Sequence, residues 1–294
     1  VSVAAGERHV ALVTATGKLF TAGYGGHGQL GHGGLSAELA PRRVEGLERV
    51  VSAAVGAHHT LALDAEGSVW SFGEGRRGRL GHGSEAAELR PRLVEALEGT
   101  RVVQVAAGDA HSVALSAGGA VLTFGGGGSG TAPGGLGHGE DLGDELWPRH
   151  VAELEEVAVG AVFAGPCVTA AVSEGGSAYL WGAAAAPAGG EEGGCSRLAT
   201  GGAAHANAPA LVAGLGGVRA AALGRHHTAL LCEDGSVWTC GDGRHGRLGH
   251  GSQEPSRLPR RVEGLESCGE VAVGTYHTAS LGAWDGGVSV WGLV

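Results

Sequence analysis

GDGRHGRLGHG, at residues 241–251, decides the fold of this chain through its repetition. It opens with Gly241-x-Gly243-x-x-Gly246, the spacing of a dinucleotide-binding loop. Such a loop must lead into a helix whose N-terminus holds the phosphate. Related stretches recur at 23–33 (GYGGHGQLGHG), 73–83 (GEGRRGRLGHG) and, more loosely, 125–139. No copy leads into an amphipathic helical pattern, so we interpret the stretch as a structural turn that occurs once per repeat unit.

Three landmarks return in one order, and the glycines of the first stand 50 to 59 residues apart. The first is a Gly-x-x-His turn, whose glycine stands at 6, 56, 108, 224 and 274, with a copy at 165 that lacks the histidine. The second is LGHG, with its histidine at 32, 82, 138 and 250 and with Thr200 in its place in the fourth unit. The third is Pro-x-x-Val, from Pro41, Pro91, Pro148, Pro209 and Pro259. This order predicts tandem units in a single domain over 1–294: roughly 1–50, 51–102, 103–157, 158–218, 219–268 and a partial 269–294.

Each unit has the pattern of four short strands. The first is small and apolar, as in VSAAVG at 51–56, which suits an innermost strand where backbones crowd. A glycine-containing turn joins the second and third strands, and the fourth opens with proline, which suits a sheet edge. Residues Ala22, Phe72, Phe124, Trp181, Cys240 and Trp291 share one position on the third strand and are expected to wedge between blades. The prediction is an all-β propeller of about six blades of four antiparallel strands.

The last blade is expected to be incomplete, because the sequence ends after its third strand. Its unprotected edge would favour aggregation. There is no methionine, even at residue 1, which suggests that the chain is part of a larger protein.

The three motifs resemble the repeat of the regulator of chromosome condensation family, along the whole chain. The resemblance implies a β-propeller, usually of seven blades, so a fragment of seven and a ring of six both stay open. Family members include exchange factors for Ran-type GTPases, recognition modules of HECT-type ubiquitin ligases and a plant ultraviolet-B photoreceptor. The photoreceptor carries tryptophan after the turn glycine. Light sensing is not expected here, because these positions are Glu7, Ala57, Asp109, Pro166, Arg225 and Thr275.

Composition argues against several other classes. The formal net charge is −10, which disfavours a general nucleic-acid binder and makes chromatin an unfavoured partner. The five cysteines are scattered without metal-ligand spacing, as expected of reduced thiols in a cytoplasmic or nuclear protein. We expect no membrane association, because the longest apolar run, 157–172, is too short to span a bilayer.

The fifteen histidines raise the question of a metal site. We expect the repeating ones (His9, His59, His111, His227 and His277) to form hydrogen bonds within their own blades. No Cys, His and carboxylate cluster has ligand spacing, and no GxSxG, HExxH or kinase signature occurs. We therefore expect a non-catalytic protein with no metal, no cofactor and no small-molecule substrate.

Strand connectivity sorts the loops onto two faces. The loops after the first and third strands share one face, called the first face here, and the others form the second face. The second face collects acidic residues: Glu48, Asp64, Glu66, Glu98, Glu155, Glu156, Glu174, Glu233, Asp234, Glu266 and Asp285. Units three and four place acids on the first face: Asp109, Glu140, Asp141, Asp144, Glu145, Glu191 and Glu192. Units one, two and five place arginines there: Arg8, Arg76, Arg77, Arg79, Arg225, Arg244 and Arg247.

If the ring nearly closes, these arginines form one basic crescent. Clustered arginine offers bidentate donors to carboxylate or phosphate, which predicts docking of a protein with an acidic surface, such as a small GTPase. The alternative is a solvated surface of balanced charge. The predicted function is a non-catalytic protein–protein interaction scaffold. The alternatives are a nucleotide exchange factor for a Ran-type GTPase and a recognition module of a HECT-type ubiquitin ligase.

Overall fold

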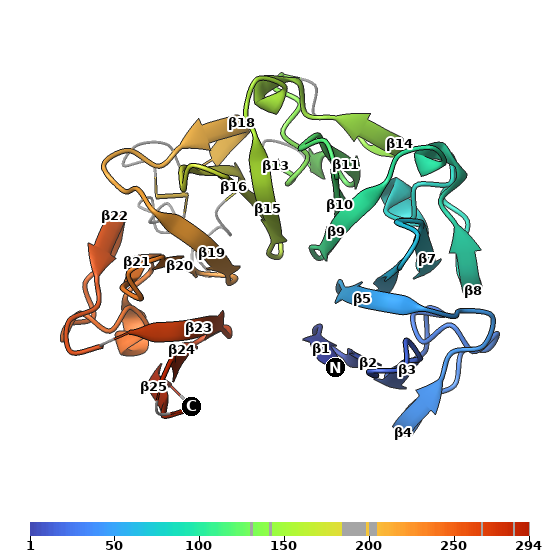
Figure 1. Cartoon of the computed structure of the whole chain (residues 1–294), viewed down its shortest axis with the longest axis horizontal. Coiled ribbons are helices and arrows are strands. Elements are labelled where there is room, and N and C mark those ends of the chain that lie inside the picture. The colour runs from blue at the N-terminus through green and yellow to red at the C-terminus, as the bar shows by residue number, and fades with distance from the viewer. Residues whose placement is uncertain are drawn as a thin grey trace.

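The computed structural model describes residues 1–129, 132–140, 143–183, 198–199, 205–265, 267–284 and 286–293. These ranges form six antiparallel sheets, the blades, arranged around one axis (Figure 1). Blades one to five have four strands each, and blade six has three. The predicted propeller and its incomplete last blade are therefore confirmed.

The strands of each blade follow one another in chain order. Blade one contains β1 (Ser2–Ala5), β2 (His9–Val13), β3 (Leu19–Gly23) and β4 (Glu38–Arg43). Blade two contains β5 (Val50–Val55), β6 (His59–Asp64), β7 (Val69–Gly73) and β8 (Glu88–Leu93). Blade three contains β9 (Val102–Ala107), β10 (His111–Ser116), β11 (Val121–Gly125) and β14 (Glu145–His150).

The second half repeats this plan. Blade four contains β15 (Val159–Ala164), β16 (Val168–Ser173), β17 (Ala178–Ala183) and β18 (His205–Leu211). Blade five contains β19 (Val218–Leu223), β20 (His227–Cys232), β21 (Val237–Gly241) and β22 (Ser256–Arg261). Blade six contains β23 (Cys268–Val273), β24 (His277–Gly282) and β25 (Val288–Gly292).

Short strands and 3₁₀ turns lie in the loops between the blade strands. The strands β12 (Gly128–Ser129) and β13 (Ala132–Pro133) pair as a small hairpin in blade three. Three-residue 3₁₀ turns occur at η1 (Arg76–Gly78), η2 (Glu95–Leu97), η3 (Ala152–Leu154) and η4 (Arg244–Gly246). None of the helices in the described ranges is long and apolar enough to cross a membrane.

The hydrophobic core lies between the blades. Each pair of consecutive blades encloses one buried apolar cluster within the described residues. The third-strand wedges Phe72, Phe124 and Trp181 are fully buried in these clusters, as predicted. The LGHG glycines make room for them, since a Cβ on Gly81 would stand 3.0 Å from the Phe124 ring. Small glycines and large wedges thus fit together across each interface.

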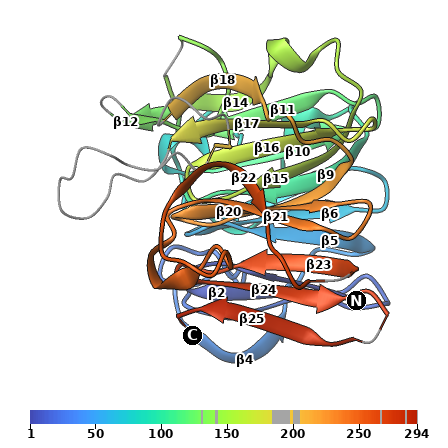
Figure 2. The same ribbon diagram turned by 90° about the vertical axis from the view of Figure 1, so that its left-hand side faces the viewer.

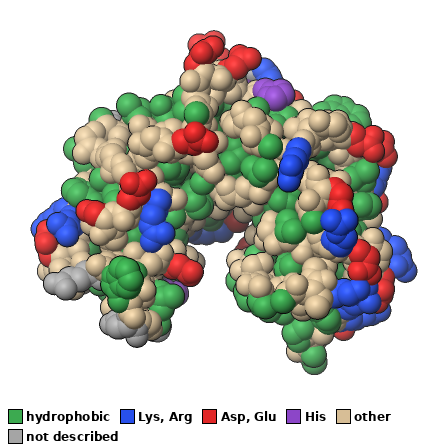
Figure 3. All heavy atoms as spheres, viewed as in Figure 1, with side chains coloured by type: hydrophobic (Ala, Val, Ile, Leu, Met, Phe, Trp, Pro, Cys, Tyr) green, Lys and Arg blue, Asp and Glu red, His purple; other side chains and the backbone are tan. Residues whose placement is uncertain are grey.

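The ring is open between blade six and blade one. Figure 1 shows the two end blades apart, and Figure 3 shows the same opening in the molecular surface. Surfaces beside it are exposed: Leu39 of blade one is 102% exposed, whereas Leu89, its counterpart in blade two, packs against Gly28 of blade one. Blades one and six are therefore not joined by the contacts that link the other blades.

The two faces are arranged as the connectivity predicts. In Figure 2, β12 and the C-terminal end lie on the left side of the molecule, which is the first face. The N-terminal end lies on the opposite side, at the second face, from which Figure 3 is viewed. The third-strand loops and the Gly-x-x-His turns therefore share the first face.

Candidate protein-docking face

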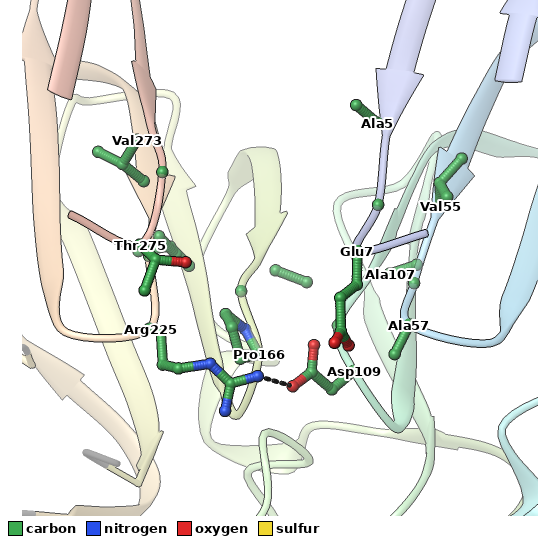
Figure 4. A pocket seen from close by; sticks show the side chains of 18 residues that line it. Ala5, Glu7, Val55, Ala57, Ala107, Asp109, Pro166, Arg225, Val273 and Thr275 are labelled. Carbon is green, nitrogen blue, oxygen red and sulfur yellow. Dashed lines mark hydrogen bonds and ion pairs between the residues drawn. The ribbon is translucent and has the colours of Figure 1, made fainter. Parts of the chain in front are cut away.

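The Gly-x-x-His turns surround the axis of the propeller. Each blade contributes three consecutive residues to a cavity of about 270 Å³, for example Ala107, Gly108 and Asp109 (Figure 4). Glycine is needed because the backbones crowd here: a Cβ on Gly108 would stand 2.5 Å from the carbonyl oxygen of Gly165. The residue after each glycine forms the rim of the cavity on the first face.

The turn histidines bind the next blade, so the prediction of bonds within one blade was wrong. His9 Nε2 lies 2.9 Å from Thr60 Oγ1 of blade two, and His227 Nε2 lies 2.7 Å from Thr278 Oγ1 of blade six. His59 and His111 make the same contact with Ser112 and Thr169. The hydroxyl stands one residue after the next turn histidine or its counterpart, so only the folded geometry brings the two groups together. The LGHG histidines do bond within their blades, as His82 does to Ser71 at 2.8 Å.

Burial keeps these histidines neutral. The cost of burying a charge lowers the pKa of His9 and of His111 to about 4, and that of His227 to about 3. Nearby charges add to this effect, as Arg79 does at His111. The inner histidines therefore support the blades and do not supply charge to the first face.

Two of the seven predicted arginines are buried. Arg79 is 6% exposed and Arg247 is 2% exposed. Arg79 pairs with Glu74 at 3.0 Å and donates to the carbonyl oxygens of Arg76 and Asp109. Arg247 likewise donates to the carbonyl oxygens of Arg244 and Thr275. Both side chains fix the loops and turns beneath the face, so they cannot offer a partner the free guanidinium that the sequence prediction assumed.

The other arginines reach solvent. Arg8, Arg76, Arg225 and Arg244 are exposed, and Arg77 is half-buried. Their role in binding stays a prediction. Arg77 and His245 occupy equivalent loop positions and have left-handed backbones, with φ of 63° and 60°. Non-glycine residues adopt this conformation at a cost, and such positions often cluster at functional sites.

Aromatic and histidine side chains gather beside these arginines, which the sequence analysis did not anticipate. In blades one and two, the His27 and His58 rings lie 4.4 Å apart, and Arg8 stands 5.8 Å from the Tyr24 ring. Their counterparts in blades five and six are His226 and His245. The centroids of these two rings lie 6.2 Å and 5.7 Å from the centroid of the Tyr276 ring. The signal in the sequence was the recurrence of Tyr and His in the turn and loop positions of just these blades.

The arginines do not form one continuous crescent. Arg8, Arg76 and Arg77 belong to blades one and two, and Arg225 and Arg244 belong to blade five, so the opening between blade six and blade one (Figure 1) separates the two sets. The predicted crescent depended on near closure of the ring, and the open ring divides it into two groups. The predicted acids Asp141, Glu191, Glu192, Glu266 and Asp285 lie outside the described residues, as do Thr200 and Cys195.

Two tryptophans are exposed: Trp147, on β14, by 53%, and Trp284, in the β24–β25 turn on the second face, by 89%. In the part of the chain that the structure describes, the four cysteines Cys167, Cys232, Cys240 and Cys268 form no disulfide bond. Within the described ranges, no group of three His, Cys, Asp or Glu side chains is arranged to hold a metal ion.

The chain belongs to the RCC1-like domain family, whose model matches residues 1–294. It is 36% identical over 306 residues to human E3 ubiquitin-protein ligase HERC2, a match that covers 99% of this chain and 6% of HERC2. It is 33% identical to the ultraviolet-B receptor UVR8 of Arabidopsis thaliana, over 66% of this chain and 42% of that receptor. The chain thus spans a small part of HERC2.

Solved structures agree on the fold. Human WBSCR16 superposes with a TM-score of 0.76 at 23% identity, over 95% of this chain and 71% of that one. Prp20p of Saccharomyces cerevisiae superposes with a TM-score of 0.75 at 21% identity, over 99% of this chain and 68% of that one. The family resemblance expected from the sequence is therefore confirmed.

Proposed function

We propose that this RCC1-like propeller is a protein-interaction module that docks an acidic partner on its first face. The carrying observation is the set of exposed arginines that stand next to tyrosine and histidine side chains on that face. Tyrosine and arginine dominate the energetically important positions of protein interfaces. Guanidinium groups also bind carboxylates in a fixed, bidentate geometry.

Rigid support strengthens the proposal. Arg79 and Arg247 hold the loops that carry Arg76 and Arg244, through hydrogen bonds of 3.0 Å and 2.8 Å to their carbonyl oxygens. In each loop a side chain accepts a hydrogen bond from the left-handed residue, Glu85 from the Arg77 N–H and Gln253 from the His245 N–H. Residues held in place lose less conformational entropy on binding, which favours affinity.

The test replaces Arg76, Arg77 and Arg244 by glutamate. A fluorescein-labelled octaglutamate peptide serves as the acidic probe, and its affinity is measured by fluorescence anisotropy at low and at physiological salt. We expect a loss of about tenfold or more, because charge-assisted hydrogen bonds become repulsions. The matched control replaces Arg42, Arg92 and Arg149, which pair with glutamates on the outer strands, with the same change in net charge. Equal losses in both triple variants, or salt-insensitive binding by the first, would contradict the proposal.

A nucleotide exchange activity is the rival function. Prp20p has been described by its binding to Gsp1p and histones, but its 21% identity to this chain supports the fold alone. The purified chain would be incubated with a Ran-type GTPase loaded with fluorescent GDP. The interaction-module proposal predicts no change in GDP release, and acceleration by orders of magnitude would replace it.

A recognition module within a larger ubiquitin ligase is a compatible second candidate. The match to HERC2 covers 99% of this chain, at 36% identity, so a comparable module sits within that ligase. If this chain serves such a ligase, fusing it to a HECT-type catalytic domain should direct ubiquitin onto an octaglutamate-tagged protein. The Arg76, Arg77 and Arg244 triple variant of the fusion should not.

A further inference from the structure

Two arginines of the first face, the exposed Arg225 and the half-buried Arg77, already form ion pairs with carboxylates of this chain. Arg77 contacts both oxygens of Asp144, with Nη2 2.8 Å from Oδ1 and Nε 3.2 Å from Oδ2. Arg225 Nη2 lies 3.2 Å from Asp109 Oδ2, across the mouth of the axial cavity (Figure 4). Both carboxylates belong to blade three, whereas the arginines come from blades two and five.

The main chain fixes the two acids in place. The Gly127 N–H donates to Asp144 Oδ1 at 3.0 Å. The Asp109 N–H donates to the Pro166 carbonyl at 3.1 Å, and the Asp109 carbonyl accepts from Arg79 at 3.3 Å. Burial tends to raise the pKa of Asp144, but the hydrogen bonds from Arg77 and Gly127 outweigh it, so the pKa lies below its ordinary value. Asp144 is therefore charged near neutral pH, both acids are anchored by the main chain, and the long arginine side chains reach to them.

These pairs are accessible to a competitor. The paired side chains are between 30% and 45% exposed. Ion pairs at that exposure contribute little to stability, because water and salt screen them. An external carboxylate can therefore exchange with the internal one at small cost, and the arginine needs only a change of rotamer.

We infer that Asp109 and Asp144 are built-in competitors that occupy Arg225 and Arg77 until an acidic partner displaces them. This inference rests on the proposed function. It adds a minimum number of adjacent negative charges that a partner needs in order to bind. A single partner carboxylate exchanges one ion pair for another and gains almost nothing at these two arginines. A partner with several adjacent acids also engages Arg8, Arg76 and Arg244, so the face selects clustered over isolated negative charge.

The test replaces each competitor by its uncharged isostere, Asp109→Asn and Asp144→Asn, singly and together. Affinity for the octaglutamate probe should rise about two- to fivefold for each change, the range expected for releasing an exposed ion pair. The affinity for a probe with one glutamate among serines should rise by a larger factor than the affinity for octaglutamate. After the change, a single carboxylate can bind the released arginine without first displacing an internal one. The control is Glu140→Gln, on the same face and blade, a carboxylate that no described arginine contacts. It removes the same charge without releasing an arginine.

The outcomes separate this inference from the proposed function. If the arginine triple variant loses the probe but the asparagine variants bind like Glu140→Gln, the competitor role is wrong and the docking face stands. Weaker binding by the asparagine variants would also overturn it, since the acids would then be positioning the arginines. If the triple variant binds octaglutamate as tightly as the unmodified chain, the proposed function itself fails. Either single asparagine variant carries the test alone if the other does not fold.

Discussion

The direction of the proton in each histidine bridge follows from its hydroxyl partner. Thr60 Oγ1 donates to the Gln29 carbonyl at 2.8 Å, so its hydrogen is committed. His9 Nε2 must therefore be the donor to Thr60, which leaves His9 Nδ1 as a bare acceptor without a hydrogen-bond partner. The same reasoning applies to His227, whose partner Thr278 donates to the Arg247 carbonyl at 2.7 Å. One tautomer, neutral and protonated at Nε2, thus serves both interfaces.

A single glycine tests the fit between loop and wedge. Gly137 has φ of 82°, and a Cβ there would stand 2.6 Å from the Trp181 ring. Gly99 has φ of 81° with nothing within 4 Å of its would-be Cβ. Gly99→Ala should lower the free energy of unfolding by about 1 kcal/mol, because alanine disfavours the left-handed backbone at this position. Gly137→Ala should cost about 1–3 kcal/mol more, because the core is overpacked. Urea unfolding of both variants measures the difference, and equal losses would show that the wedge is not tightly packed.

At the scale of the element, the histidine bridges make stability depend on pH. The pKa values of His9, His111 and His227 in the fold, about 4, 4 and 3, lie below the ordinary 6.5 of an unfolded histidine. Above pH 6.5 neither state is protonated, so their contribution is complete. As pH falls below 6.5, only the unfolded chain gains protons, and the free energy of unfolding falls by up to about 1.4 kcal/mol per pH unit for each histidine.

The expected loss at pH 5 is about 2 kcal/mol for each of these three histidines, or roughly 6 kcal/mol together, comparable with the whole stability of many domains. His59, the fourth bridge histidine, adds to this loss, because burial also lowers its pKa. The urea midpoint should therefore drop steeply between pH 7 and pH 5, above the range where carboxyl groups titrate. His111→Gln removes one of four such groups, His59 included, and should make that dependence less steep by about a quarter. A midpoint that stays constant over this range would contradict the buried, neutral bridges.

The sequence predicted the strands and turns better than the contacts between the blades. Turn glycines, alternating strands and the third-strand wedges each depend on local backbone geometry, which repeats visibly along the chain. The histidine bridges link residues about 50 positions apart, such as His9 and Thr60, so their direction depends on how blades pack. Arg79 and Arg76 look alike in the sequence, yet one lies under the loop and the other on it, because only the folded turn decides which side chain points inward.

The two faces of the open ring carry different charged residues. Hairpin turns on the second face carry acidic residues, whereas the predicted arginines of the first face lie on both sides of the opening and their partners Asp109 and Asp144 lie in blade three. Arg77–Asp144 and Arg225–Asp109 link these opposite charges. Two of the first-face arginines are therefore already paired at rest, and we expect partner binding to exchange these ion pairs instead of only neutralising free charges.

Hydrogen exchange of the chain with and without bound octaglutamate tests whether the first face is the docking face, because it locates the probe on one face or the other. We expect slower exchange in the first-face segments 6–9, 74–79, 224–227 and 242–247, and no change in the hairpin turns of the second face at 64–68, 116–120 and 233–236. Protection confined to the second face, or binding without protection of the first-face segments, would contradict the docking face proposed for this propeller.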